Sequence, residues 1–225
     1  VVQTHISFIF IAGDMVYKVK KAVDFGFLDF TTLEKRKFYC AEELRLNRRL
    51  APETYLGVET ITEDAAGRLA LNGSGPIVEY AVRMKKLPLE RMLGRLLAEG
   101  KCDPAMIEGV AETLADFHRR AETGGRIDAL GGVETIRLNH EENFAQTAAY
   151  VDVTIPRGRY AFISAYDRDF LKRQDSLFRR RVSEHRIRDC HGDLHLEHIC
   201  VTNGITIFDC IEFNERFRFG DVAAE

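Results

Sequence analysis

The chain has 225 residues, enough to bury a core as one large domain or as two small lobes. Its composition, 45% hydrophobic and 30% charged without low-complexity tracts, is typical of a soluble globular protein. A net charge of −3 gives no reason to expect nucleic acid or an anionic membrane as partner, and no apolar run approaches the roughly 18 residues of a membrane span. The five cysteines form no Cys-x-x-Cys pair, so we expect reduced thiols and a cytoplasmic protein.

The first 85 residues have the pattern of a β-rich region with one helix. Apolar and alternating runs on either side of Gly13-Asp14 predict a hairpin over residues 8–20. The sequence Thr31-Thr-Leu-Glu34 is a capping box, which predicts a helix from there to Pro52. Further strands are expected at residues 58–61, 69–71 and 77–84.

After residue 85 the pattern becomes helical. A short helix is expected over residues 89–99, and Asp103-Pro104 predicts the start of a longer one that ends near Arg120. Residues 134–185 have helical patterns interrupted around Pro156. The order of the elements therefore predicts an α+β fold with two regions, 1–85 and 86–225.

A polar loop and a second hairpin near the C-terminus are the most informative stretch. The loop is His191-Gly-Asp-Leu-His-Leu-Glu-His198, and the two apolar runs that follow are separated by Asn203-Gly204, a strong hairpin signal. Because a hairpin brings its ends together, we expect Asp209 to return beside Asp193, Glu197 and His198.

Glu43 is the clearest anomaly in the first half. It shares a helical stripe with Tyr39 and Leu46, and a carboxylate on an inward face is costly unless a cation accompanies it. Lys18 and Lys20 point to the same face of the second strand, and we prefer Lys18 because the apolar run Met15-Val-Tyr17 precedes it. The alternative is a boundary glutamate that reaches water.

Two other interpretations of polar residues stay open. The hydroxyls of Thr4 and Ser7, at the start of the first hairpin, could contact phosphate or be ordinary strand-edge groups. His191, Asp193, His195 and His198 could form a transition-metal cluster, which would indicate a metal-dependent hydrolase.

Taken together in order and spacing, these motifs resemble the aminoglycoside phosphotransferase-like branch of the protein-kinase-like fold. His191-Gly-Asp-Leu-His195 is similar to its catalytic loop, Phe208-Asp209 to its metal-binding aspartate, and Gly220-Asp221-Val-Ala-Ala-Glu225 to the acidic segment that follows. Val16-Tyr-Lys18 and Glu43 stand where that family keeps its Lys–Glu pair. The similarity is greatest to bacterial members often fused to a P-loop ATPase domain.

The resemblance implies a two-lobed kinase-like fold, with a nucleotide-binding lobe over 1–85 and a helical lobe over 86–225. It also implies ATP as phosphate donor, Mg²⁺ as cofactor and a small-molecule acceptor, with a fused or separate P-loop ATPase domain as partner. Asp193 would be the base for the acceptor hydroxyl, His191 would brace the loop and Asp209 would bind the metal. Lys18, paired with Glu43, would contact the phosphates, and the adenine would lie between Val16 and the segment 79–84, which includes Tyr80, Val82 and Met84.

The sequence departs from the family pattern in three places. His198 stands where the family has an asparagine that binds a second Mg²⁺, so Glu197 could supply that oxygen, or the site could hold Mn²⁺ or be weakly active. The first hairpin has no glycine-rich loop, and the chain stops at Glu225, before the helices expected to complete the second lobe. A nucleotide-binding module with little transfer activity is therefore the alternative to a phosphotransferase.

Overall fold

The structure, a computed structural model, describes residues 1–225. It divides into two compact units, each built from two stretches of the chain. The first unit consists of Val1–Arg119 and Asp193–Asn214, and the second of Arg120–Gly192 and Glu215–Glu225. The two regions expected from the sequence, 1–85 and 86–225, stay a prediction.

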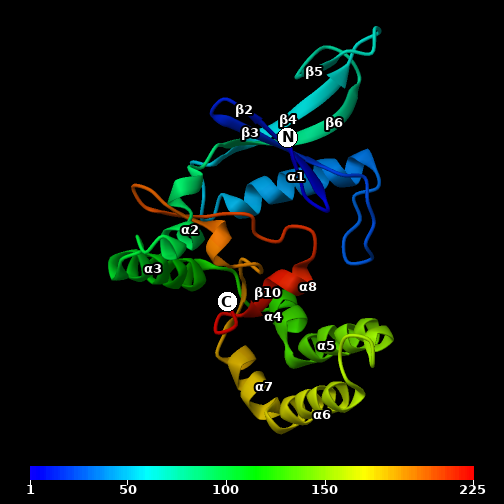
Figure 1. The fold of residues 1–225 in the computed structure, drawn as a ribbon, viewed down its shortest axis with the longest axis vertical. Helices are drawn as coiled ribbons and strands as arrows, with labels where there is room; N and C mark the ends of the chain where they lie inside the picture. The colour runs from blue at the N-terminus through cyan, green and yellow to red at the C-terminus, as the bar shows by residue number, and fades with distance from the viewer. The chain divides into compact units, whose positions relative to one another are not determined.

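A six-stranded antiparallel sheet forms the β-rich part of the first unit (Figure 1). The spatial order is β1-β2-β3-β6-β4-β5. The strands are β1 (Val2–Gln3), β2 (Ser7–Ala12), β3 (Met15–Lys20), β4 (Tyr55–Glu63), β5 (Leu69–Leu71) and β6 (Ile77–Lys85). The hairpin expected over residues 8–20 is confirmed, and an antiparallel sheet with separate helices is compatible with the α+β class.

The pairing of β3 with its neighbours fixes which side chains share a face. Lys18 lies opposite Ile9 of β2 and Val82 of β6, and Lys20 lies opposite Ser7. Since side chains alternate along a strand, Val16, Lys18 and Lys20 all point to one face of the sheet. This is the relationship that the alternating sequence predicted.

Helix α1 (Leu33–Asn47) packs against this sheet and begins one residue later than the sequence predicted. Its N-cap is Thr32, whose hydroxyl accepts a hydrogen bond from the Lys35 N–H at 3.2 Å. The expected N-cap, Thr31, instead donates its hydroxyl to Asp29 Oδ1 at 2.6 Å. Because the Thr31 hydroxyl is bonded within the preceding turn, the next residue, Thr32, caps the helix.

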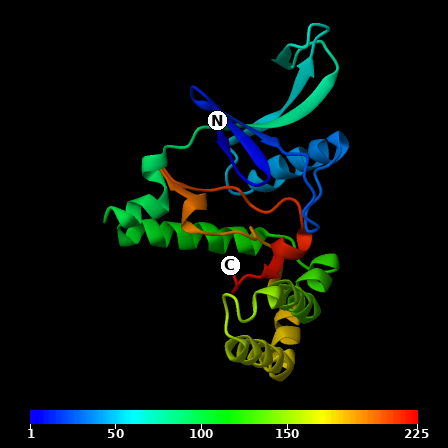
Figure 2. The ribbon, with the colours of Figure 1, turned by 45° about the vertical axis from the view of Figure 1, so that its right-hand side comes forward.

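Two helices and the second hairpin complete the first unit. Helix α3 (Pro104–Arg120) runs beside the hairpin formed by β8 (Ile199–Val201) and β9 (Ile205–Ile207), as Figure 2 shows. A shared apolar core joins them to α2 (Leu93–Ala98) through Leu93, Leu96, Val110, Ile199, Val201 and Ile207. The helix expected over 89–99 is divided into a 3-10 turn (Leu89–Arg91) and α2, because the extended residue Met92 pairs with Cys200.

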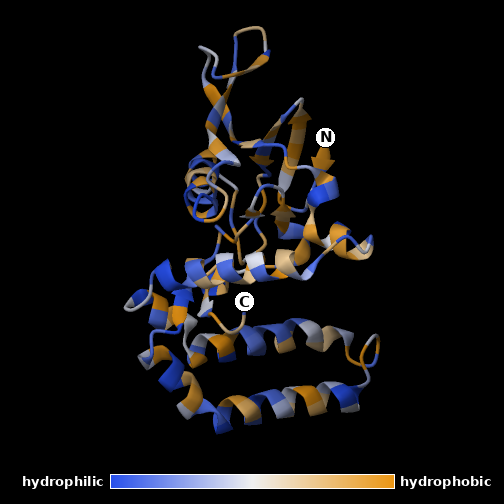
Figure 3. Cartoon of the chain, turned by 90° about the vertical axis from the view of Figure 1, so that its left-hand side faces the viewer, coloured by the Kyte–Doolittle hydropathy of each residue, from blue (hydrophilic) through white to orange (hydrophobic).

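The second unit is mainly helical. Its helices are α4 (Arg126–Gly131), α5 (Val133–Thr147), α6 (Arg157–Arg173), α7 (Asp175–Ser183) and α8 (Glu215–Arg218). The expected interruption at Pro156 is confirmed, since Pro156 is the N-cap of α6. Helices α5 and α6 lie side by side with polar and apolar residues mixed along both (Figure 3), and Arg168 joins them through Glu141 at 2.5 Å.

A two-stranded pairing of β7 (Ile187–Asp189) with β10 (Phe219–Asp221) ties the ends of the second unit together. Within it, Arg218 donates to Asp189 at 2.6 Å, and both side chains are buried. None of the helices has both the length and the apolar character needed to span a bilayer.

Candidate functional site

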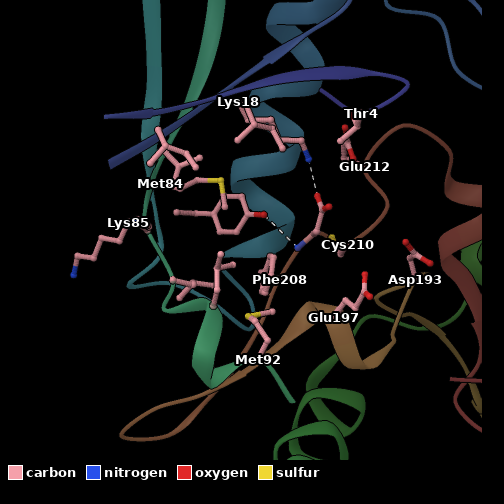
Figure 4. Close-up of a pocket in the computed structure, with 18 of the residues that line it drawn as sticks. Thr4, Lys18, Met84, Lys85, Met92, Asp193, Glu197, Phe208, Cys210 and Glu212 are labelled. Carbon is pink, nitrogen blue, oxygen red and sulfur yellow. Dashed lines mark hydrogen bonds and ion pairs between the residues drawn. The ribbon is translucent and has the colours of Figure 1, made fainter. Parts of the chain in front are cut away.

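A cavity of about 660 Å³ opens in the first unit, and all the residues that line it belong to that unit (Figure 4). One part of its wall is apolar and includes Ile9, Ile11, Val16, Met84, Leu87, Met92 and Phe208. Charged side chains line the rest, among them Lys18, Asp193, Glu197, Asp209 and Glu212. In the view of Figure 4, Met84 and Lys85 lie on the left and Asp193 on the right, with Lys18 and Phe208 between them. The apolar side chains and the carboxylates thus line different parts of one cavity.

Lys18 lies between two carboxylates at the centre of this site. Its Nζ is 2.9 Å from Glu43 Oε1 and 2.6 Å from Asp209 Oδ1. Burial alone would lower the pKa of Lys18, but the charges of Asp209 and Glu43 raise it well above its usual value. Lys18 is therefore protonated at neutral pH, and the pairing with Glu43 predicted from the sequence is confirmed.

Glu43 also contacts the other candidate lysine. Lys20 Nζ is 2.7 Å from Glu43 Oε2, and it donates a further short hydrogen bond to Glu212. Burial would raise the pKa of the Glu43 carboxyl, but Lys18 and Lys20 hold it below its usual range. Both candidate lysines therefore pair with Glu43, and each binds one oxygen of its carboxylate.

Sequence reasoning missed Glu212 entirely. It follows Asp209 by three residues in a segment without regular secondary structure, where no periodicity identifies an inward-facing side chain. Burial raises the pKa of Glu212, although Lys20 opposes that effect. The only signal in the sequence is that Glu212 is acidic and lies close to Asp209, which the predicted hairpin had identified as a candidate site residue.

The second hairpin brings Asp209 back beside the polar loop, as expected. Ile199 lies opposite Ile207, and the backbone N–H of Phe208 donates to the carbonyl of His198 at 3.0 Å. Asp209 itself has a left-handed backbone with φ of 63°, a conformation that is uncommon for residues other than glycine, and its N–H donates to the Tyr55 hydroxyl at 3.2 Å. The hairpin and Tyr55 together hold the backbone at Asp209.

Asp209 stays ionised over a wide pH range. Burial would raise its pKa, but the charge and hydrogen bond of Lys18 lower the pKa to about 2. Lys18 binds Oδ1, whereas Oδ2 faces the imidazole of His198 at 3.7 Å. One oxygen of this carboxylate is thus directed toward the polar loop.

The polar loop places Asp193 and two histidines close together. Asp193 Oδ2 is 3.8 Å from His198 Nδ1 and 3.9 Å from His195 Nε2, and the two rings lie 3.7 Å apart between centroids. The carboxylate of Asp193 is half exposed and lines the cavity with Glu197. Ligand atoms of Asp193, His195 and His198 lie within 4.8 Å of one another, so these three residues could hold a metal ion.

His191 is the remaining member of the metal cluster that the sequence left open, and it belongs to the second unit. Its side chain is buried, and its backbone N–H donates to the Glu225 carboxylate at 2.6 Å, as the N–H of Gly192 does at 2.7 Å. The three-residue metal group does not include it.

Only some of the residues expected to bind a nucleotide line the cavity. Val16 and Met84 line the cavity, and the wall continues from Met84 into Lys85, Lys86 and Leu87. Tyr80 and Val82 belong to the apolar core that also contains Cys40 and Met84, but unlike Met84 they do not line the cavity. Ser7 is also outside the wall and fully buried, whereas Thr4 lines the cavity.

Comparison with known proteins places relatives in mycobacteria. Uncharacterised proteins from two strains of Mycobacterium tuberculosis and from Mycobacterium bovis are each 30% identical to this chain over 220 residues. The matched region is 97% of this chain but 42% of each relative, so the chain spans less than half the length of these curated proteins. No family model and no solved structure matches the chain.

Carboxylates outnumber the ammonium groups at the site. Three carboxylates, Glu43, Asp209 and Glu212, surround the two ammonium groups of Lys18 and Lys20, and Asp193 and Glu197 add further negative charge at the cavity. Oxygen donors of this kind suit hard divalent ions.

Proposed function

We propose that this chain is the catalytic part of an ATP-dependent phosphotransferase that acts on a hydroxyl group of a small molecule. The observation that carries the proposal is the position of Lys18 between Glu43 and Asp209, on the wall of a cavity that Asp193 also lines. A lysine on a strand paired with a helix glutamate, next to a metal-binding aspartate, is the arrangement that kinases use to hold nucleotide phosphates. The proposal includes the two-lobed protein-kinase-like fold.

The apolar wall of the cavity suits a nucleotide base. Val16, Met84 and Phe208 would pack against the two faces of a purine, and the backbone from Met84 to Leu87 would reach its edge. Lys18 would then meet the phosphates in its protonated form, since its pKa is raised well above the usual value. The ion pair with Glu43, at 2.9 Å, would hold the ammonium group beside the phosphates.

Asp209 fits the role of a metal ligand. Its pKa of about 2 keeps it ionised at neutral pH, and one of its two oxygens is turned away from Lys18. Mg²⁺ bound by this carboxylate would neutralise the charge that develops on the phosphates. Asp193 and Glu197 offer further oxygen donors on the same cavity wall.

Asp193 would serve the acceptor. The acceptor oxygen forms a bond to the γ-phosphorus of ATP, the bond from that phosphorus to the bridging oxygen breaks, and ADP leaves with the electron pair. The acceptor proton passes to the Asp193 carboxylate, which is half exposed and lies beside His198. Catalysis by this site would consist of positioning and charge neutralisation.

A thermal-shift titration with ATP tests the proposal. ATP with a divalent metal is expected to raise the melting temperature, because a ligand at one hundred times its Kd stabilises the folded state by about 2.7 kcal/mol. Lys18→Met should remove the shift, whereas Lys172→Met, an exposed lysine on α6, should keep it. An unchanged melting temperature for the folded wild-type protein with ATP and either Mg²⁺ or Mn²⁺ would contradict nucleotide binding.

A further inference from the structure

We infer that His198 is a nitrogen ligand of the metal that Asp209 binds, and that the site therefore prefers first-row transition ions such as Mn²⁺ and Co²⁺ over Mg²⁺. The inference deepens the proposed function, since it rests on Asp209 as the carboxylate ligand of the metal. It concerns the ring nitrogen Nε2 of His198 and the oxygen Oδ2 of Asp209, which face each other at 3.7 Å.

The hydrogen bonding of His198 decides which ring nitrogen carries the proton. Nδ1 lies 2.9 Å from the backbone carbonyl oxygen of Asp193. A carbonyl oxygen can only accept, so Nδ1 must carry the hydrogen, and the neutral ring then has its lone pair on Nε2. Metal-binding histidines are commonly oriented in this way, with the second ring nitrogen donating to a backbone carbonyl.

The distance between Nε2 and Asp209 Oδ2 fits a shared metal better than a direct bond. At 3.7 Å the two atoms are too far apart for a hydrogen bond. Ligand bonds of about 2.0–2.2 Å to one ion place neighbouring N and O atoms roughly 3 Å apart. A movement of a few tenths of an ångström by each side chain would close the site around an ion, while Oδ1 stays with Lys18.

Packing holds the His198 ring in position. Its side chain is 15% exposed, against 45% for the neighbouring His195, and its ring packs against the rings of His195 and Phe208 at centroid distances of 3.7 and 5.7 Å. A ring restrained by two such contacts loses little freedom when it binds an ion. His198 is thus a preorganised ligand and not a solvated surface histidine.

The adjacent His195 has the opposite arrangement. Its Nδ1 accepts a hydrogen bond from the Glu197 N–H at 3.3 Å, so the neutral ring carries its proton on Nε2, which faces Asp193 at 3.9 Å. His195 therefore presents an N–H to the carboxylates, where His198 presents a lone pair. Of the two imidazoles, only His198 is set to bind the metal of Asp209.

One nitrogen ligand changes the preference among metals. Mg²⁺ favours oxygen ligands in octahedral geometry, and imidazole binds Mg²⁺ poorly. For a site with nitrogen and oxygen donors, affinity rises from Mn²⁺ through Co²⁺ along the first transition row. The presence of His198 therefore predicts a site that binds Mn²⁺ more tightly than Mg²⁺.

Pulsed electron paramagnetic resonance of bound Mn²⁺ tests this directly. The full chain is prepared with natural-abundance and with ¹⁵N-labelled histidine, and each is measured with Mn²⁺ alone and with Mn²⁺ and ADP. We expect nuclear modulation from a coordinated imidazole nitrogen that changes on labelling. His198→Asn should abolish it, and His195→Asn, the matched neighbour, should keep it. Competition with Mg²⁺ should show a loss of roughly tenfold or more in Mn²⁺ preference for His198→Asn.

The outcomes separate the inference from the proposed function. Bound Mn²⁺ without histidine modulation, modulation that survives in His198→Asn, or modulation lost in His195→Asn each overturns the inference, as does the absence of bound Mn²⁺ in folded protein. An ATP-dependent thermal shift with Mg²⁺ in any of these cases leaves the proposed function standing. Histidine modulation without nucleotide binding would support the metal site and contradict the phosphotransferase. A variant His198→Gln, with unchanged circular dichroism, guards against loss of folding as the cause.

Discussion

Lys20 and Glu43 form an ion pair of 2.7 Å in which both side chains are completely buried. The same glutamate binds Lys18 through its other oxygen, and Lys20 in turn binds Glu212. Strand β3, helix α1 and the segment after Asp209 are therefore joined by one chain of alternating charges. Lys20 also lies 4.8 Å from the centroid of the Phe30 ring, which adds a cation–π contact. Lys20 does not line the cavity, but through Glu43 it helps to position Lys18, which in turn binds Asp209.

We predict that Lys20→Met destabilises the protein strongly. It leaves Glu43 and Glu212 buried with one cation fewer, and breaking a buried ion pair by removal of one partner costs about 3–5 kcal/mol. Urea unfolding measures the change. Lys172→Met, at an exposed position of α6, should change the free energy of unfolding by less than about 0.5 kcal/mol. Equal stability of the two variants would show that the buried network contributes nothing.

Asp193→Asn should separate nucleotide binding from transfer. The amide keeps the size of the side chain but accepts no proton, so the rate of transfer should fall by roughly 10²–10⁴-fold. The thermal shift with ATP and metal should stay within the error of the wild-type value. Asp169→Asn, an exposed residue of α6 paired with Arg173 at 3.0 Å, is the control and should retain full activity. The measured rate is that of phosphate transfer to an acceptor found by screening, or that of ATP hydrolysis. Wild-type turnover by Asp193→Asn would exclude Asp193 as the base.

The stability of the protein should fall in acid because of Asp209 and Glu43. Both carboxyls have a lower pKa in the folded state than their usual value, about 2 for Asp209. Their stabilisation is complete above the unfolded values near 4 and is lost as the pH falls toward the folded values. Glu212, whose pKa is raised, acts in the opposite direction, since its contribution is lost as the pH rises through its pKa.

Urea unfolding between pH 6 and pH 2.5 measures that dependence. We expect the free energy of unfolding to decrease below pH 4 in the wild-type protein and to decrease less steeply in Asp209→Asn, which lacks one of the two titrating groups. Asp169→Asn should follow the wild-type curve. Parallel curves for wild type and Asp209→Asn would mean that Lys18 does not hold the carboxylate in the ionised form.

A Gly192→Ala variant tests whether the backbone of the polar loop requires a glycine at this position. Gly192 has φ of 86°, and a Cβ added there would lie 2.8 Å from the carbonyl oxygen of Phe217. Gly100 also has a positive φ, of 66°, but an added Cβ meets nothing within 4 Å. Gly100→Ala should therefore cost only the strain of the left-handed backbone, about 1–2 kcal/mol. Gly192→Ala should cost more, because Phe217 must also move, and the difference in unfolding free energy between the two variants isolates the clash.

Local sequence patterns predicted much of the framework of the site. The alternation along residues 15–20 placed Lys18 and Lys20 on one face, and Asn203-Gly204 returned Asp209 to the polar loop. Both results follow from neighbours in sequence, because strand period and turn geometry are local properties. The inward position of Glu43 followed in the same way from the helical stripe.

Contacts between distant segments decided the rest. Sequence periodicity could not show that Glu43 binds both lysines, since that depends on how α1 crosses β3. It could not reveal Glu212, which lies in an irregular segment, or show that Met84 lines the cavity while Tyr80 and Val82 do not. Local periods determine which face a side chain takes, whereas packing of separate elements determines which groups meet across that face. The sequence by itself therefore determined the inward directions of Lys18, Lys20 and Glu43, and only the tertiary structure decided that Glu43 binds both lysines and that Glu212 binds Lys20.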